Sequence, residues 1–472
     1  MRNFCWNHVC GAIGAVAAVC VVFFSATAQA ETKGYSVPDE LRSGLWSVTA
    51  DGQPVGVYSA RTCDPPFDVR YDFGGEYAFA GLDLDSPVTL TIRTLVPRNL
   101  DAVRVLPASA GVQARRIDDS TLELRLEKPC KLSLEPNGRE HPLLIFANAP
   151  ETEVPDFSDP NVVVFRAGLH RPEGGRVDLR DGQTLYLEAG AVLQAGIAAQ
   201  GKNIRICGRG VLDSSLWEWR KGPTGHVLEL WKCQNLRVEG ITIRGASHWT
   251  VVPICCDGVE IRDLKLCGGR VQNDDGINPC NSRNVHISEC FIRTDDDCLA
   301  LKGLDADYGN CENITVENCI LWCDRARIVL MGHESRAPFM RNIRFENLEI
   351  IHTQYRVFLL EPGEEMRMED VHVRGVHVES DAPGRTYQLL TARPTVNQYM
   401  RKQVPGHVTN CTFSDLTFTG VESPVEVLLE GKDAEHQAEN VSLKNVRIFG
   451  VPMTSENGLK VGDFTKNVTN EP

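Results

Sequence analysis

Nine residues, Asn313-ITVENCIL, decide the fold because their pattern recurs along most of the chain. Each copy begins with Asn or another small or polar residue, and apolar side chains then alternate with polar ones on both sides of a polar break. Alternation with period two is typical of a β-strand with one buried face. The other copies are Asn203-IRICGRGVL, Asn235-LRVEGITI, Gly258-VEIRDLKL, Asn284-VHISECFI, Asn342-IRFENLEI, Asp370-VHVRGVHV, Asn410-CTFSDLTF and Asn440-VSLKNVRI.

The spacing of these copies predicts a solenoid. From Asn235 onward, successive copies begin 23, 26, 29, 29, 28, 40 and 30 residues apart. Repeats of this length made of short strands stack into one continuous core. The repeat shows no helical periodicity, so we predict an all-β chain folded as a right-handed parallel β-helix. The polar break is expected to be a corner, after which a second apolar run such as Leu299-Ala-Leu forms the next wall.

The Asn that opens most copies is expected at a turn, where its backbone is left-handed and its amide pairs with the copy next to it. Asn313, Asn410 and Asn440 also fit the glycosylation sequon. We interpret these three as structural positions of the repeat, and Asn467 as the sequon that lies off the repeat.

The rest of the chain predicts an export signal and a second domain. Residues 1–30 combine Arg2, an apolar stretch at 11–24 and a small-residue end at 28–30, as in a cleaved secretory signal. The protein is therefore predicted to be secreted or periplasmic, with no membrane span after cleavage. Residues 31–157 lack the repeat, and their strand-like runs predict a small β-sandwich. Residues 158–465 are predicted to form the β-helix, with a first coil at 182–191.

The charge and the cysteine content limit which binding partners, disulfides and metal sites can be expected. Without the signal, 48 Lys and Arg oppose 63 Asp and Glu, a net charge of −15, which argues against nucleic acid as a partner. Of 17 cysteines, 14 lie outside the signal, and many are spaced close to the repeat period. We expect most of them to be buried in the core, with one or two disulfides left open. No Cys or His group has zinc spacing, and we expect a monomer.

Two acidic segments lie on consecutive copies, Asn273-Asp-Asp-Gly276 and Thr294-Asp-Asp-Asp-Cys298. In both, an Asp stands just before the second apolar run, so Asp275 and Asp297 should be stacked at the coil spacing of about 4.8 Å. Arg327 and Arg356 occupy the equivalent position in the next two coils, and Lys302 follows at the end of the strand.

Three carboxylates this close, Asp275, Asp296 and Asp297, cannot titrate as isolated acids. One should keep its proton toward neutral pH while another stays ionised. Cleavage of a glycosidic bond needs this combination, an acid for the leaving oxygen and a base for water. A calcium site or a solvated acidic turn would also explain the acids. The neighbouring arginines favour a glycan cleft, because a metal site gains nothing from them.

The motifs resemble the polygalacturonase-like glycoside hydrolases, family 28. Asn273-Asp-Asp-Gly276 is similar to the Asn-Thr-Asp-Gly motif of that family, and Asp296-Asp-Cys-Leu-Ala-Leu-Lys302 to its Gly-Asp-Asp-Cys-Ile-Ala-Ile-Lys motif. Ser247-His-Trp-Thr250 also resembles a family segment, while Glu346 to Thr353 and a leading β-sandwich resemble the dextranase and isopullulanase group, family 49. The resemblance implies a pectin-lyase-like solenoid that acts on a polysaccharide or oligosaccharide.

The resemblance also implies roles. Asp296 would be the general acid, Asp275 and Asp297 would activate water, and the anomeric centre would be inverted in a single displacement. No obligatory metal or organic cofactor is implied. Arg327 stands where the family carries a His, and Tyr355-Arg356 replaces its Arg-Ile-Lys segment, so the glycan is expected to differ from homogalacturonan. The candidate substrate-binding residues are Lys302, Arg327, Arg356, His333 and Trp249.

Two other classes of function stay open from the sequence. A polysaccharide lyase would need a uronate substrate and a basic proton acceptor, for which Arg327 or Lys302 is a candidate, and usually calcium. A solenoid that binds glycans without cleaving them would not depend on Asp296.

Overall fold

A computed structural model describes residues 33–68, 70–381 and 384–472. The predicted secretory signal lies outside these residues. Strands and turns dominate, and the helical elements described are four 3-10 turns, η1 (Asp39–Leu41), η2 (Ala108–Ala110), η3 (Glu173–Gly175) and η4 (Ala306–Tyr308). Among the described residues, no helix has the length and apolarity needed to cross a membrane.

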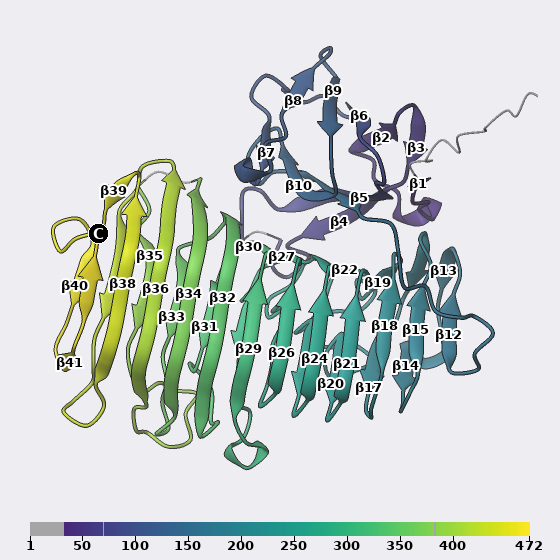
Figure 1. Ribbon diagram of the computed structural model, residues 1–472. Coiled ribbons are helices and arrows are strands. Elements are labelled where there is room, and N and C mark those ends of the chain that lie inside the picture. Colours follow the sequence, from purple (N-terminus) through teal and green to yellow (C-terminus); the bar gives the residue numbers. More distant parts are fainter. Residues whose placement is uncertain (1–32, 69, 382–383) are drawn as a thin grey trace, which may run out of the picture. The chain divides into compact units, whose positions relative to one another are not determined.

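Two facing sheets form the N-terminal part (Figure 1). The first contains β1 (Lys33–Gly34), β4 (Val57–Thr62), β5 (Gly75–Asp83), β7 (Arg104–Leu106), β10 (Cys130–Glu135) and β11 (Leu143–Asn148). The second contains β2 (Trp46–Ala50), β3 (Gln53–Val55), β6 (Val88–Thr94), β8 (Ala114–Arg116) and β9 (Thr121–Leu126). Alternating apolar side chains from both sheets, among them Trp46, Leu90 and Ile145, fill the core between them. The predicted β-sandwich is confirmed.

The remainder is a solenoid of parallel strands, as predicted (Figure 1). Its largest sheet contains β12 (Val162–Phe165), β13 (Gly168–His170), β15 (Thr184–Leu187), β16 (Ala191–Leu193), β18 (Arg205–Gly208), β19 (Val211–Asp213), β21 (Gln234–Glu239), β22 (Thr242–Arg244), β24 (Asp257–Arg262), β25 (Lys265–Cys267), β26 (Arg283–Ser288), β27 (Phe291–Thr294), β29 (Cys311–Glu317), β30 (Ile320–Cys323), β32 (Phe339–His352), β34 (Arg367–Ser380), β36 (His407–Gly420), β38 (Ala438–Ile448), β39 (Val451–Pro452), β41 (Thr465–Lys466) and β42 (Thr469–Glu471).

Two further sheets form the other wall. One contains β14 (Arg176–Leu179), β17 (Gly196–Ala199), β20 (Leu228–Trp231) and β23 (Val251–Ile254), and the other contains β28 (Leu299–Leu301), β31 (Arg327–Met331), β33 (Arg356–Leu360), β35 (Tyr387–Ala392), β37 (Val425–Leu429) and β40 (Leu459–Val461). Between them, the coil that carries Gly276 to Cys280 is held by isolated bridges. Pro279 lies in this coil and has no N–H to donate to a ladder. The wall is thus interrupted beside the acidic segments.

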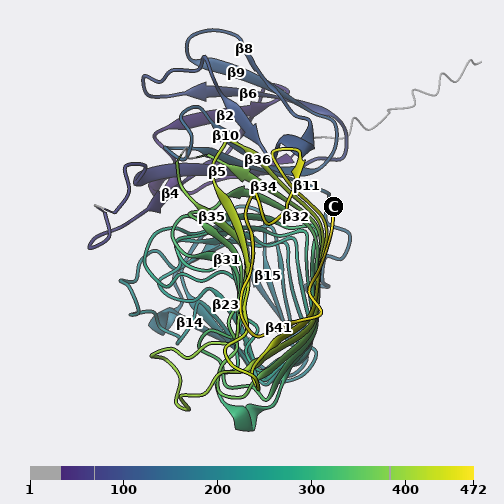
Figure 2. The ribbon, with the colours of Figure 1, turned by 90° about the vertical axis from the view of Figure 1, so that its left-hand side faces the viewer.

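Figure 2, turned toward the C-terminal end of the solenoid, shows its strands stacked one behind another. The first coil begins at β12 and β13, which pair with β15 and β16. It therefore precedes residues 182–191, and the prediction of a first coil there was wrong. These strands lie inside the predicted β-helix, but they were not recognised as a coil because they lack the Asn-led pattern. The predicted division into two domains at residue 157 stays a proposal, since residues 32–472 cluster as one unit.

The Asn positions of the repeat form hydrogen-bonded ladders along the solenoid. The Asn313 amide donates to Asn284 at 3.0 Å and that of Asn342 to Asn313 at 2.7 Å, and Asn313 has a left-handed backbone with φ 56°. These observations confirm the expected turn. Asn467 donates to Asn440 at 2.9 Å, so it continues a ladder and the view that it lies off the repeat was wrong.

The polar break behaves differently along the solenoid. In the early coils it separates two strands, such as β26 and β27, as expected for a corner. In β32, β34 and β36 it lies inside one strand of 14 residues. There Asn347, Gly375 and Asp415 have φ of 53°, 68° and 55°, so one left-handed residue bends the strand without ending it. The expected corner is therefore absent from these later strands.

The 14 cysteines in the described part of the chain are free thiols, and all except Cys130 and Cys255 are buried. The backbone N–H of Cys233 donates to Cys256 Sγ of the next coil at 3.3 Å, as expected for thiols stacked in the core. Among these described cysteines, the disulfides that the sequence left open are not formed.

Aromatic and charged side chains join the sandwich to the solenoid. Tyr77 and Phe146 of the sandwich belong to the same buried cluster as Trp322 of the solenoid. Between them, the fully buried Arg293 guanidinium lies 4.3 Å from the Tyr77 ring and 4.0 Å from the Trp322 ring and contacts Asp324 at 3.3 Å. Arg293 also donates to Thr62 Oγ1 of the sandwich at 3.0 Å, so its contacts with Tyr77 and Thr62 fix the sandwich against the coils.

Candidate active site

The strand register places four charged residues at one position of four successive coils. Arg327 pairs directly with Arg356. The pairing of β28 with β31 sets Asp297 beside Arg327, and the bridges of the preceding coil set Asp275 beside Asp297. The predicted stack of two aspartates followed by two arginines is thus confirmed by the register. Asp275 lies in the coil that interrupts the wall, where isolated bridges replace a continuous strand.

Each of the three candidate carboxylates is buried and has a cationic neighbour. Asp275, 2% exposed, accepts from Lys302 Nζ at 3.1 Å and from the Asn278 amide at 2.9 Å. Asp297, also 2% exposed, lies 3.2 Å from Arg327 Nε and accepts from the Arg327 backbone N–H at 3.1 Å.

Asp296 is the most exposed of the three carboxylates, at 6%. It forms a close ion pair with Arg325 and accepts a long hydrogen bond from the Asn273 amide at 3.4 Å. The cationic partner of the predicted acid is thus Arg325, which the sequence reasoning missed.

Burial and mutual repulsion disturb the titration of this cluster. Burial raises the pKa of Asp297 to about 8, against the opposing effect of Arg327 and with further help from Asp296 and Asp275. Burial also raises the pKa of Asp275, although Lys302 opposes it. At neutral pH the site therefore retains a proton on Asp297, as three crowded carboxylates require.

The two remaining acids of the segments, Asp274 and Asp295, have structural contacts. Asp274 is fully buried and accepts the backbone N–H groups of Gly269, Asp295 and Asp296 at 2.6, 2.8 and 3.1 Å. It thereby fixes the turn that carries Asp296 and Asp297.

Asp295 is held by the sandwich. Arg70 donates to it at 3.0 Å and the Tyr71 hydroxyl at 2.8 Å, while Arg325 donates from the solenoid side at 2.7 Å. Sequence reasoning missed Arg70 and Tyr71, and no local signal would have identified them, because they lie more than 220 residues from Asp295. A cavity of about 590 Å³ adjoins this contact, lined among others by Arg70, Tyr71 and Phe73.

Trp249 and Lys302, predicted to bind substrate, lie together at the carboxylates. Lys302 Nζ is 3.9 Å from the Trp249 ring centroid and 3.0 Å from Glu334 Oε1. The Trp249 ring stacks on His226 at 5.1 Å and on His248 at 5.5 Å. Burial lowers the pKa of His226 to about 4 and also lowers that of His248. The three parallel rings are therefore uncharged at neutral pH and form a surface of the kind on which a sugar ring stacks.

The other predicted substrate-binding residues lie further out. Arg356 donates to Gln388 at 3.0 Å and covers the Tyr355 ring. His333 contacts Glu361 at 2.7 Å and lies 5.7 Å from the Tyr399 ring of the long loop 393–406. The structure thus groups Lys302, Arg327 and Trp249 with the carboxylates, whereas Arg356 follows one coil away and His333 belongs to a neighbouring cluster.

Comparison with known proteins finds similarity to the family that the motifs resemble. The model for glycosyl hydrolases family 28 matches residues 193–323, which contain the three carboxylates, Trp249 and Lys302. A probable polygalacturonase of Vitis vinifera is 24% identical over 194 residues, which cover 38% of this chain and 38% of that protein. A probable polygalacturonase of Arabidopsis thaliana is 30% identical over 149 residues, which cover 26% and 32%. The matched stretches thus span about a third of these relatives' own length.

Solved structures support the fold over a longer part of the chain. Dex49A from Penicillium minioluteum superposes with a TM-score of 0.63 at 15% identity, and the match covers 90% of this chain and 92% of that one. A hyperthermoactive exopolygalacturonase from Thermotoga maritima superposes with a TM-score of 0.50 at 16% identity, covering 66% and 84%. The predicted resemblance to this group of β-helix proteins is confirmed.

Proposed function

We propose that this chain is an exported glycoside hydrolase that cleaves a polysaccharide or oligosaccharide with inversion at the anomeric carbon. The observation that supports this best is the set of three buried carboxylates, Asp275, Asp296 and Asp297, on adjacent coils beside a surface of uncharged rings. The matched family model and the two relatives point to the same chemistry.

Asp296 is proposed as the general acid and Asp275 with Asp297 as the groups that activate water. The surroundings add a condition. Asp296 forms a close ion pair with Arg325, and a general acid must carry a proton before it can protonate the leaving oxygen. Asp297, whose pKa is raised to about 8, is the neighbour able to hold that proton at neutral pH. Proton sharing within such a cluster belongs to the set of groups and not to one residue.

The proposed substrate contacts differ in kind. The ring surface of Trp249, His226 and His248 would stack on a sugar face. Lys302 and Arg327 form ion pairs with Asp275 and Asp297. Their main effect is therefore to lower the pKa values of those carboxylates against the effect of burial. Arg356, bound to the neutral side chain of Gln388, is the predicted cation best placed to take a carboxylate or sulfate of an anionic glycan.

The lyase alternative is disfavoured by the state of its candidate bases. Burial lowers the pKa of Lys302, but Asp275 and Glu334 outweigh this effect and raise it well above the ordinary value. The Arg327 guanidinium also stays protonated. Neither side chain can accept the proton that a lyase must remove from a uronate.

The test is a panel of polysaccharides assayed for new reducing ends with the wild type and Asp296→Asn. We expect a loss of about 10²–10⁴-fold in kcat for the variant, which is the usual share of general acid catalysis, while polymer binding is retained. Proton NMR of the first-formed product should show the inverted anomer. Retained configuration would refute the single displacement, and ultraviolet absorbance from a new double bond would favour a lyase. Unchanged biological effect without any cleavage would favour the non-catalytic solenoid.

A further inference from the structure

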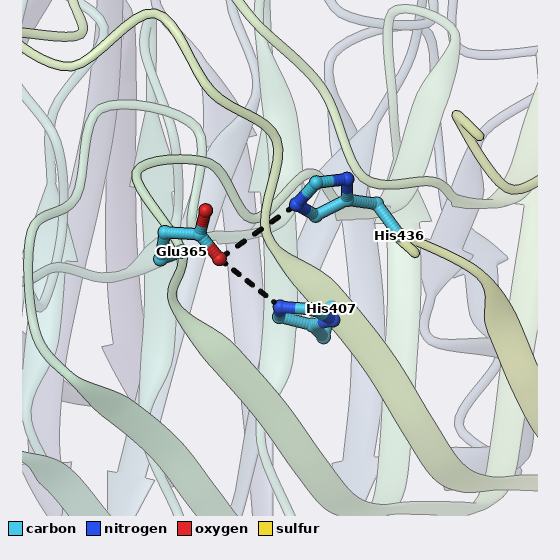
Figure 3. A group of neighbouring side chains, drawn as sticks. All are labelled: Glu365, His407 and His436. Carbon is cyan, nitrogen blue, oxygen red and sulfur yellow. Dashed lines mark hydrogen bonds and ion pairs between the residues drawn. The ribbon is translucent and has the colours of Figure 1, made fainter. Parts of the chain in front are cut away.

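Three potential metal ligands from three successive coils meet near the C-terminal end of the solenoid (Figure 3). Glu365 lies in the turn before β34, His407 is the first residue of β36, and His436 lies two residues before β38. The strand pairing brings these segments into neighbouring coils. The ligand atoms of the three side chains all lie within 4.8 Å of one another.

Both imidazoles approach one carboxylate oxygen. Glu365 Oε2 is 3.3 Å from His407 Nε2 and 3.7 Å from His436 Nε2, and Figure 3 shows both rings facing this one oxygen from the same side of Glu365. The two imidazole rings are 5.0 Å apart between centroids. Two nitrogens and an oxygen that converge in this way form one face of a coordination sphere.

A fourth residue orients one of the ligands. Asp433 Oδ1 is 2.8 Å from His436 Nδ1 and also accepts the backbone N–H groups of Glu435 and His436, each at 2.9 Å. An ionised carboxylate can only accept, so Nδ1 carries a hydrogen, and Nε2 is the nitrogen whose lone pair a metal ion would take. Metal-binding histidines almost always have such a partner on the other ring nitrogen, which fixes the tautomer and the ring orientation.

We propose that Glu365, His407 and His436 bind one divalent transition-metal ion, with Zn²⁺ as the best fit. Zinc takes imidazole nitrogens at about 2.0–2.1 Å and carboxylate oxygens at about 2.0–2.2 Å, so two ligands of a tetrahedral site lie about 3.4 Å apart. The two oxygen–nitrogen distances, 3.3 and 3.7 Å, are close to this value, and the Glu365 side chain, 57% exposed, can adjust to the ion. Calcium is a poorer fit because it prefers oxygen ligands throughout. Water would complete the sphere on the exposed side.

The ion would fasten the base of the long loop 393–406. The backbone N–H groups of Glu364 and Glu365 donate to the carbonyls of Val404 and Pro405 at 2.8 and 3.0 Å, so the turn bearing one ligand already pairs with the end of the loop. His407 follows that end directly. Across the loop, the Tyr399 carbonyl accepts from Arg336 at 2.7 Å. A metal ion at this point would therefore hold the loop to the coils and stabilise it against local opening.

The test is a zinc titration of the full chain, stripped of metal, by isothermal calorimetry with a chromophoric chelator as competitor. We expect one equivalent to bind and the melting temperature to rise with Zn²⁺. Asp433→Asn should weaken binding by roughly 10–100-fold, as loss of an outer hydrogen-bond partner does. His407→Gln and His436→Gln should weaken it further and abolish the thermal shift.

The matched control is His286→Gln, which removes a histidine that faces a single carboxylate, Glu317 at 2.9 Å. This variant should bind zinc as the wild type does. Substitution by Co²⁺ should give visible bands without the thiolate charge-transfer band that cysteine ligation produces. Failure of the wild type to bind one equivalent would overturn the proposal, as would binding that survives in the folded double variant of His407 and His436. Circular dichroism establishes that the variants are folded.

Discussion

Replacement of Asp297 by Asn should change how the stability of the protein depends on pH. The folded-state pKa of Asp297 is about 8, whereas an unfolded aspartate titrates near about 3.9. The folded state therefore binds a proton more tightly than the unfolded state, and stability falls as pH rises between these two values. Asn is nearly isosteric with Asp and does not titrate, so the stability of the variant should lack this decrease with rising pH.

The magnitude follows from the two pKa values. Ionisation of Asp297 destabilises the wild type by about 1 kcal/mol at pH 4.5 and by about 5 kcal/mol at pH 8. The free energy of unfolding of Asp297→Asn, minus that of the wild type, should thus increase by about 4 kcal/mol between these pH values. Any constant effect of the amide on packing cancels in this comparison, because it is present at both pH values.

The assay is urea denaturation of both proteins at pH 4.5, 6 and 8. Asp257→Asn is the control, because hydrogen bonds from Arg283 and Asn284 lower the pKa of Asp257, so its difference from the wild type should be constant over this range. A constant difference for Asp297→Asn would refute our placement of the proton. If Asp296→Asn showed the increase instead, the proton would already lie on the proposed acid of the free protein.

Other contacts at the site lead to further expectations. Arg325→Gln removes a charged hydrogen-bond donor from Asp295 and Asp296, and should lower the free energy of unfolding by about 1–3 kcal/mol at neutral pH, measured by urea denaturation. Trp249→Ala should raise KM on the best glycan about tenfold with a smaller change in kcat, as expected for a lost stacking partner of about 1.5 kcal/mol; a change confined to kcat would contradict a binding role. Arg70→Gln should cost about 1.5–3 kcal/mol of stability and reduce activity through the turn at Asp295, whereas a purely local role in the sandwich would leave kcat unchanged.

The fold was predictable because the repeat can be recognised directly in the sequence, both within each copy and in the spacing of the copies. Alternation in each copy gives the strands, the intervals between copies give the coil, and the Asn positions give the ladders. The boundaries were harder. β12 and β13 carry no Asn-led pattern, and the polar break of β32 reads like that of β26, although only the earlier coils turn a corner there. Whether a left-handed residue ends a strand or merely bends it depends on the neighbouring coils, which one sequence segment does not specify.

The site residues at equivalent positions of successive coils were predictable, whereas those that other segments contribute were not. The stack of Asp275, Asp297 and Arg327 follows from counting coil positions. Arg325 stands two residues before Arg327, but nothing in its sequence indicates that its side chain turns toward Asp296. Arg70 lies in the other part of the chain, where only the folded contact reveals its partner. The proposed metal site was missed for the same reason, since its ligands are 42 and 29 residues apart and match no spacing typical of zinc.

The contact of Arg70 and Tyr71 with Asp295 has a consequence for how this architecture can be altered during evolution. The loop of the sandwich acts as a permanent counterion for an acid that neighbours the proposed catalytic pair. Suppose that the solenoid lost its sandwich or received one from an unrelated protein. The buried Asp295 carboxylate would then lack the hydrogen bonds from Arg70 and Tyr71. The two parts are thus expected to be inherited together, and recombination should succeed only at breakpoints that keep residue 70 and residue 295 from the same parent.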